Sequence, residues 1–203
     1  YKAGALFGRR SLLKVQNCII SDNGSLEYGG AGMMNHGAFI HAIDCEIVRN
    51  TTRQLGGGFR SSHNSSWIAC TVFERCLIAD NKTNLENGLY GGGITISGGN
   101  LWLINSTITN NGAFQQGGGI SANKGHYIYM ISSTIVNNYF TGFSQQAQNL
   151  GTQIRHTTEP TFRMFNSSIL GSTDTGTVDD YPYYANLLDA NPVSYTLLRA
   201  HET

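Results

Sequence analysis

The chain has 203 residues, enough for one domain with a substantial buried core. Charged residues make up only 13%, and 13 basic residues balance 13 acidic ones to a net charge of zero, which excludes strong attraction to phosphate backbones or anionic lipid. No segment approaches the roughly 18 apolar residues of a membrane-spanning helix. We therefore expect neither a nucleic-acid partner nor a transmembrane segment, and the 25 glycines favour a repetitive β architecture.

The first feature along the chain is a short internal repeat. Each copy alternates apolar residues around a Cys or Ser, and all but the last copy end in Asn; the copies cover 15–23, 42–50, 73–81, 103–111, 130–138 and 164–170. Alternation with a period of two predicts strands that bury one face. The Cys/Ser positions are Cys18, Cys45, Cys76, Ser106, Ser133 and Ser167.

A second, glycine-rich motif lies between these copies. It occurs at 30–33, 56–59, 91–94 and 117–120, with a degenerate copy at 150–152. We expect its glycines to let the backbone turn tightly into a further strand. Two interleaved motifs with one common period predict an all-β fold, a parallel β-helix or solenoid of about six coils with three short strands each. Equivalent positions would then stack about 4.8 Å apart.

The motif Gly-Gly-Gly-Ile at 91–94, followed by Asn-Ser-Thr-Ile-Thr-Asn-Asn at 105–111, resembles the repeats of right-handed parallel β-helix proteins. These include the passengers of polymorphic outer-membrane proteins and other adhesins, within the pectate-lyase-like superfamily. The resemblance extends over residues 4–171 and implies a right-handed, single-stranded β-helix at the cell surface or outside the cell. It says little about activity, because such helices serve as lyases, hydrolases, epimerases, adhesins and spacers.

We expect residues 1–171 to form the repeats. Since Tyr1 falls in the middle of a coil, the chain is interpreted as a fragment of something longer. Residues 172–203 are expected to form an irregular tail or cap.

The Cys/Ser column has two interpretations, a metal or disulfide site and a ladder of small buried side chains. Stacked neighbours suit the Cα separation of a disulfide, but three cysteines in one column cannot all pair. No Cys-x-x-Cys motif or histidine cluster supports zinc. We favour the ladder, with no metal or cofactor; calcium has no support either.

A second column consists of asparagines, which tolerate left-handed backbone and can hydrogen-bond from coil to coil. Three of them also begin glycosylation sequons, so sugar attachment is the alternative to a structural ladder. The column contains Asn23, Asn50, Asn81, Asn111 and Asn138, and further sequons begin at Asn64, Asn105 and Asn166.

The alternation places an apolar stripe on the outside of the last three coils. An exposed stripe of this kind usually marks a contact surface. It could be covered by the chain itself, through the tail from 178 onward or a long loop. Alternatively it could bind sugar rings or a partner protein. The long loops at 82–90 and 139–148 are further candidates for binding. The stripe consists of Trp102, Ile104, Tyr129, Ile131 and Phe165.

Catalytic machinery has no signature in the sequence. Asp22 and Asp80 share a column with Arg49 between them, and the adjacent pair Asp179 and Asp180 lies in the tail. We therefore expect a non-catalytic extracellular or cell-surface β-helix protein for adhesion, carbohydrate or partner binding, or assembly. The alternatives are a polysaccharide lyase or glycoside hydrolase, and an architectural subunit packed end to end in a filament or larger complex.

Overall fold

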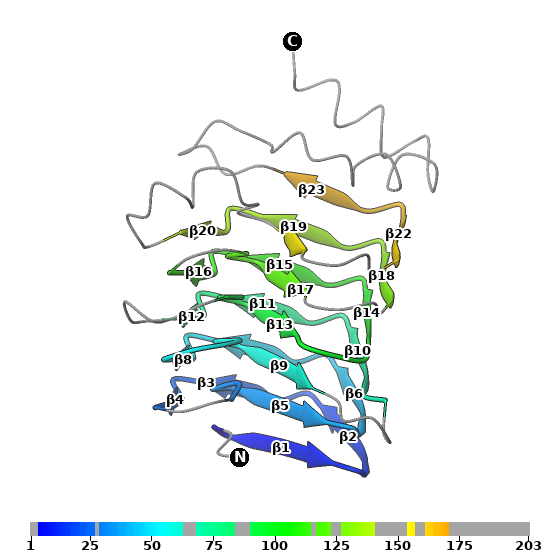
Figure 1. The fold of residues 1–203 in the computed structure, drawn as a ribbon. Helices are drawn as coiled ribbons and strands as arrows, with labels where there is room; N and C mark the ends of the chain where they lie inside the picture. The colour runs from blue at the N-terminus through cyan, green and yellow to red at the C-terminus, as the bar shows by residue number, and fades with distance from the viewer. Residues whose placement is uncertain are drawn as a thin grey trace.

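The computed structural model describes residues 4–26, 29–62, 68–83, 90–114, 117–122, 127–140, 154–156 and 161–170. Every regular element in this part of the chain is a β-strand, and all paired strands run parallel. Figure 1 shows the strands stacked coil upon coil from the N-terminal end upward. The predicted all-β parallel solenoid is confirmed.

The strands form four sheets, and each coil passes through them in the same order. Sheet A contains β1 (Leu6–Arg9), β5 (Met33–His36), β9 (Phe59–Ser62), β13 (Ile94–Ile96), β17 (Ile120–Ala122) and β21 (Ile154–His156). Sheet B contains β2 (Leu12–Gln16), β6 (Phe39–Ile43), β10 (Cys70–Glu74), β14 (Asn100–Ile104), β18 (Tyr127–Ile131) and β22 (Thr161–Phe165). Sheet C contains β3 (Ile19–Ser21), β7 (Glu46–Val48), β11 (Leu77–Ala79), β15 (Thr107–Thr109), β19 (Thr134–Val136) and β23 (Ser168–Leu170). Sheet D contains β4 (Gly24–Ser25), β8 (Thr51–Thr52), β12 (Lys82–Thr83), β16 (Gly112–Ala113) and β20 (Tyr139–Phe140).

Sheet D was not predicted. Its strands have two residues each, too few for a periodic apolar pattern, so the sequence suggested three strands per coil instead of four. Among the described residues, five successive coils contribute to all four sheets and a sixth contributes β21, β22 and β23. The coil count thus differs slightly from the expected six.

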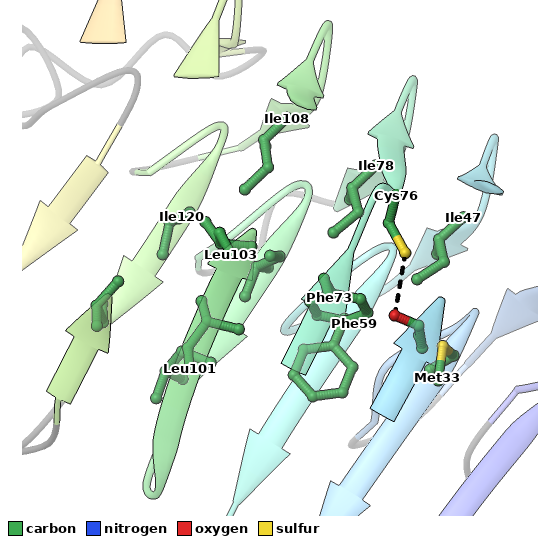
Figure 2. Close-up of a cluster of buried hydrophobic side chains, with 14 of the residues drawn as sticks. Met33, Ile47, Phe59, Phe73, Cys76, Ile78, Leu101, Leu103, Ile108 and Ile120 are labelled. Atoms are coloured by element: carbon green, nitrogen blue, oxygen red, sulfur yellow. Dashed lines mark hydrogen bonds between the residues drawn. The ribbon is translucent and has the colours of Figure 1, made fainter. Parts of the chain in front are cut away.

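The core fills the space between the sheets with stacked apolar columns. In sheet C, Ile78 pairs with Ile47 on one side and Ile108 on the other, and all three side chains are fully buried. Phe59 of sheet A meets Phe73 of sheet B edge to face, with ring centroids 5.1 Å apart. Figure 2 shows these side chains gathered between the strands. Burial of one face of every strand is the main favourable term that holds the coils together.

The corners of each coil depend on left-handed backbone at non-glycine residues. One column lies just before the Cys/Ser column, and a second lies just before the asparagine column. The ladder asparagines themselves do not have positive φ, so the left-handed role predicted for them was wrong. The preceding side chain points outward at the corner, and this leaves the ladder asparagine free to point inward. The left-handed residues are Asn17, Asp44, Arg75, Asn105, Ser132 and Asn166 in the first column, and Asp22, Arg49, Asp80, Asn110 and Asn137 in the second.

The glycine triplets allow both a turn and a close approach of coils. Gly56, Gly91 and Gly117 begin three of the triplets, with φ of 64°, 69° and 63°, which favours glycine. A Cβ on Gly92, the second glycine of its triplet, would lie 2.4 Å from the carbonyl oxygen of Gly112. The second glycine therefore lies where one coil contacts the next through backbone, and the third, as at Gly93, lies against the side chain of a ladder asparagine, Asn111.

Several predicted features lie outside the described residues. These are the tail 172–203, the sequon at Asn64 and most of the loops 82–90 and 139–148. Within the described part of the chain, no helix is long and apolar enough to cross a membrane.

Candidate functional site

The outer surface of sheet B gathers the five residues predicted for the apolar stripe. Trp102 of β14 pairs with Tyr129 of β18. In the neighbouring column Ile104 pairs with Ile131, which pairs in turn with Phe165 of β22. We call these five side chains the aromatic face. Three different repeats supply it, and only the parallel register brings them together.

The rings of the aromatic face stack on one another. The centroids of Trp102 and Tyr129 are 4.0 Å apart and their planes differ by 16°. Tyr127, two residues before Tyr129 on the same strand, is nearly parallel to it at 5.9 Å. Because the broad faces of Trp102 and Tyr129 contact each other, these rings present mainly edges to the outside.

Tyr127 belongs to this surface although the sequence prediction omitted it. Its side chain is 46% exposed, close to the 47% of Phe165. The same two-residue alternation that identified Tyr129 would have identified Tyr127, two positions earlier. The apolar surface thus extends along β18 as well as across the coils.

Charged side chains border the aromatic face at both ends. Arg163 of the sixth coil pairs with Tyr129 and is exposed, and Glu74 of the third coil pairs with Ile104. His41 Nε2 lies 3.0 Å from Glu74 Oε2, joining β6 to β10. An apolar centre with a charged rim is the usual anatomy of a protein interface.

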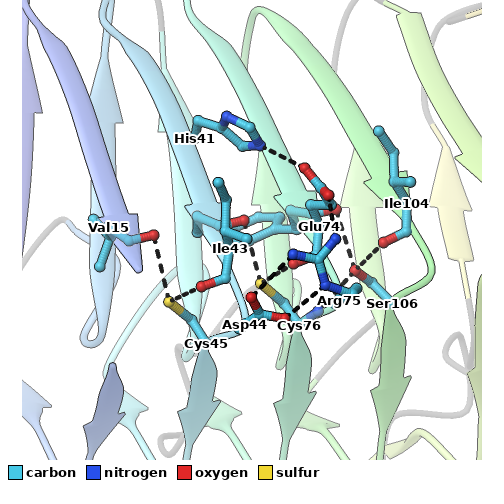
Figure 3. Close-up of polar contacts among 12 residues, drawn as sticks. Val15, His41, Ile43, Asp44, Cys45, Glu74, Arg75, Cys76, Ile104 and Ser106 are labelled. Carbon is cyan, nitrogen blue, oxygen red and sulfur yellow. Dashed lines mark hydrogen bonds and ion pairs between the residues drawn. The ribbon is translucent and has the colours of Figure 1, made fainter. Parts of the chain in front are cut away.

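Carboxylates of the first three coils are engaged by arginines. Arg75 donates from Nε to Asp44 Oδ1 at 2.7 Å and from Nη2 to Asp44 Oδ2 at 3.0 Å, and it also contacts Glu74, as Figure 3 shows. Arg49 holds Asp22 through two bonds of 3.0 and 2.9 Å. Among the described residues, no three or more His, Cys, Asp or Glu side chains converge to hold a metal ion.

These ion pairs lower the pKa of each carboxyl group. The hydrogen bond from Arg75 lowers the pKa of Asp44, and the bond from Arg49 lowers the pKa of Asp22. The contact with His41, followed by that with Arg75, lowers the pKa of Glu74. All three groups therefore stay ionised when the solution becomes mildly acidic.

A pH dependence of stability follows from the lowered pKa values. A carboxyl whose folded pKa is depressed contributes stability above its unfolded pKa and loses it as the pH falls through the folded value. For Asp44 the loss begins near its ordinary pKa of 3.8. We expect the melting temperature of the wild type to exceed that of Asp44→Asn at pH 6, and the gap to narrow as the pH falls below 3.8. The gap should be modest, since both partners are partly exposed. Thermal melts of both proteins from pH 6 downward measure this difference in melting temperature. A difference that does not change with pH contradicts the prediction.

The asparagine column forms a continuous amide ladder. Asn81 donates from its backbone N and its Nδ2 to Asn111 Oδ1, both at 3.0 Å, and Asn111 Nδ2 donates to Asn138 Oδ1 at 2.9 Å. Asn111 Nδ2 also lies 2.9 Å from the carbonyl oxygen of Ile78 in the preceding coil. Each central rung thus joins three coils, and these side chains have no exposed surface.

Burial separates the described sequons into three groups. Asn50 and Asn81 have no exposed surface and use their Nδ2 groups in the ladder, so sugar attachment there is incompatible with the folded coil. Asn105 and Asn166 are exposed at left-handed corners. Asn23, at the first rung, is half-buried and donates from Nδ2 to Asn50 Oδ1.

The Cys/Ser column is a second ladder. The Oγ of Ser106 donates to the carbonyl oxygen of Phe73 in the preceding coil and accepts from the backbone N of Cys76. In the same way, Ser133 Oγ accepts from the backbone N of Ser106 at 3.1 Å, and Ser167 Oγ accepts from the backbone N of Ser133 at 3.0 Å. All four cysteines of the chain are free, and burial raises the pKa of Cys76 to about 11.

One polar pair escaped the sequence analysis. His36 Nδ1 lies 2.9 Å from Ser62 Oγ across β5 and β9. The two residues occupy one column of the glycine-motif alignment, which could have identified them. They are only 6% and 8% exposed, so the pair is nearly buried within the protein.

In comparisons with protein-family models, curated proteins and solved structures, nothing matches this chain. The fold defines it as a parallel β-solenoid protein. Its function must therefore be argued from its own surface.

Proposed function

We propose that this chain is a non-catalytic binding protein that recognises a partner protein through the aromatic face. The observation that carries the proposal is the stack of Trp102 on Tyr129, continued by the apolar column that ends at Phe165. Aromatic side chains dominate the energetics of protein interfaces, where edge-to-face contacts are favourable. The exposed edges of Trp102 and Tyr129 can make such edge-to-face contacts with aromatic side chains of a partner protein.

Carbohydrate binding is the less favoured alternative for the same surface. A sugar ring stacked on an aromatic side chain needs an open ring face, whereas Trp102 and Tyr129 cover each other at 4.0 Å. A polysaccharide-active enzyme is less favoured still. The carboxylates of Asp22, Asp44 and Glu74 are all held by neighbouring arginines.

The location that we propose is the cell surface or the extracellular space. It rests on the resemblance of the glycine-triplet and Asn-Ser-Thr-Ile-Thr-Asn-Asn motifs to adhesin repeats. The even charge balance, 13 basic against 13 acidic residues, agrees with a partner recognised by apolar contact and not by long-range attraction.

The proposal is tested with arrays of extracellular-matrix proteins and of glycans, probed with the wild type, Phe165→Lys and Trp102→Ala. We expect binding to at least one protein, weakened at least tenfold by either change, because hot-spot aromatics contribute about 2 kcal/mol or more. Thr109→Lys on sheet C is the matched control and should bind as the wild type does.

Three outcomes would contradict the proposal. The first is glycan binding alone, lost in the same variants, and the second is protein binding that neither variant weakens. The third is turnover of a uronate polymer, which would favour the enzyme. Sedimentation at several concentrations distinguishes the remaining alternative, since an architectural subunit should self-associate and a monomer argues against it.

A further inference from the structure

The fold does not explain why the first three coils carry cysteine where the last three carry serine. The Oγ of Ser106 lies 2.9 and 3.1 Å from two carbonyl oxygens that share its single hydrogen, and it accepts a hydrogen bond from Cys76 N. The Sγ of Cys76 lies 3.4 Å from two carbonyl oxygens and also interacts with the backbone of Cys45. Serine therefore forms the hydrogen bonds of this column at least as well as cysteine does. The hydrogen bonds alone do not account for cysteine in the first three coils.

The three thiols form a regular column. Cys45 lies opposite Cys76 because the residues on either side pair in register: Ile43 with Glu74, and Glu46 with Leu77. Flanking pairs place Cys18 opposite Cys45 in the same way. Each sulfur approaches the carbonyl oxygen two residues earlier in its own coil, at 3.1, 3.1 and 3.4 Å. Figure 3 shows this shared orientation for Cys45 and Cys76.

Adjacent sulfurs with one orientation lie about one strand spacing apart, roughly 4.8 Å. A disulfide needs Cβ atoms about 3.5–4.5 Å apart, so stacked coils hold the cysteines slightly too far apart for one. Two metal–thiolate bonds of about 2.3 Å each need about 4.6 Å between sulfurs in a linear arrangement. The coil spacing thus fits a bridging ion better than a direct bond.

We propose that this thiol column binds a soft monovalent cation of the copper(I) type, held linearly between two stacked thiolates, with Cys45 as the shared ligand. Thiolates select soft ions, and two ligands suffice for a linear site, whereas zinc needs four. Cys45 has a thiol neighbour on each side. Cys18 and Cys76 are two spacings apart, about 9.6 Å, too far to share an ion without it.

The surroundings of Cys45 suit such an ion. Cys45 and Cys76 are 1% and 3% exposed, which keeps water from the ion. Each thiol releases its proton to solvent as its sulfur–metal bond forms, and no electron is transferred. The site is separate from the aromatic face and does not depend on the proposed function.

Silver(I) is the probe, because it is soft, monovalent and redox-inert. The reduced protein is incubated with silver nitrate in chloride-free buffer, freed of weakly held ions with excess methionine, and analysed by native mass spectrometry and thermal melting. We expect one retained ion per chain, two protons released per ion, and a raised melting temperature, because the ion joins neighbouring coils.

Cysteine-to-serine variants identify the ligands, since serine occupies the same column in later coils. Cys45→Ser should lose the retained ion and the thermal shift. Cys18→Ser and Cys76→Ser should each keep one ion, because each leaves a pair that includes Cys45. The outward Cys70→Ser is the matched control and should behave as the wild type.

The proposal is wrong if the wild type retains no silver, if Cys45→Ser retains as much as the wild type, or if Cys70→Ser loses it. Should Cys45→Ser fail to fold, the double variant Cys18→Ser/Cys76→Ser replaces it. That variant leaves Cys45 without a stacked neighbour and should also lose the ion; if it retains silver, the proposal is overturned.

Discussion

Replacing Asn111 with alanine will lower the free energy of unfolding by about 3 kcal/mol. The Oδ1 of Asn111 accepts from both the backbone N and the Nδ2 of Asn81, while its Nδ2 donates to Asn138 Oδ1. Alanine leaves the buried backbone N–H of Asn81 without its acceptor, and an unsatisfied buried group costs about 1–3 kcal/mol. Bonds lost at Asn138 and at the carbonyl oxygen of Ile78 add to this cost.

The matched control is the preceding residue. Asn110 is exposed and has φ of 54°, a conformation that glycine adopts without strain. Asn110→Gly should therefore change stability by less than about 1 kcal/mol. Urea denaturation of both variants measures the difference. Equal effects at 110 and 111 would show that the ladder contributes nothing beyond the turn.

Replacing Gly92 with alanine will destabilise the protein by about 3 kcal/mol or more. An added Cβ would lie 2.4 Å from the carbonyl oxygen and 2.7 Å from the backbone N of Gly112 in the next coil. These atoms belong to backbone that the parallel register holds in place, so the coils themselves must separate. Forcing extra atoms into close-packed structure costs about 1–3 kcal/mol, occasionally more, and this contact offers no flexible side chain to yield.

Gly24→Ala provides the comparison. A Cβ at Gly24 meets no atom within 4 Å, and alanine restricts the unfolded chain, which stabilises by about 0.4–1 kcal/mol where the native backbone is compatible. The two variants should therefore change the denaturation midpoint in opposite directions. A near-neutral Gly92→Ala would mean that the coils are not in the close contact described.

Much of the fold could be predicted because the solenoid repeats its local requirements in every coil. Apolar alternation identified the strands of sheets B and C, and the glycine triplets marked the entry to sheet A. Sheet D escaped because two residues, such as Lys82 and Thr83, carry no periodic signal. The corner conformation was assigned to Asn111 and its equivalents because asparagine tolerates left-handed backbone. It belongs to the residue before each of them, a column that also contains Asp22, Arg49 and Asp80.

The sequence by itself determined that equivalent residues of successive repeats would stack, and therefore that Trp102, Tyr129 and Phe165 would share a surface. Periodicity is a property of the chain alone and needs no knowledge of distant contacts. Only the tertiary structure decided how these groups meet: that Trp102 covers the face of Tyr129, that Asn111 joins three coils, and that Arg75 holds two carboxylates. Ring planes, hydrogen-bond direction and ion pairing depend on the side-chain orientations that packing imposes, and the repeat does not encode these.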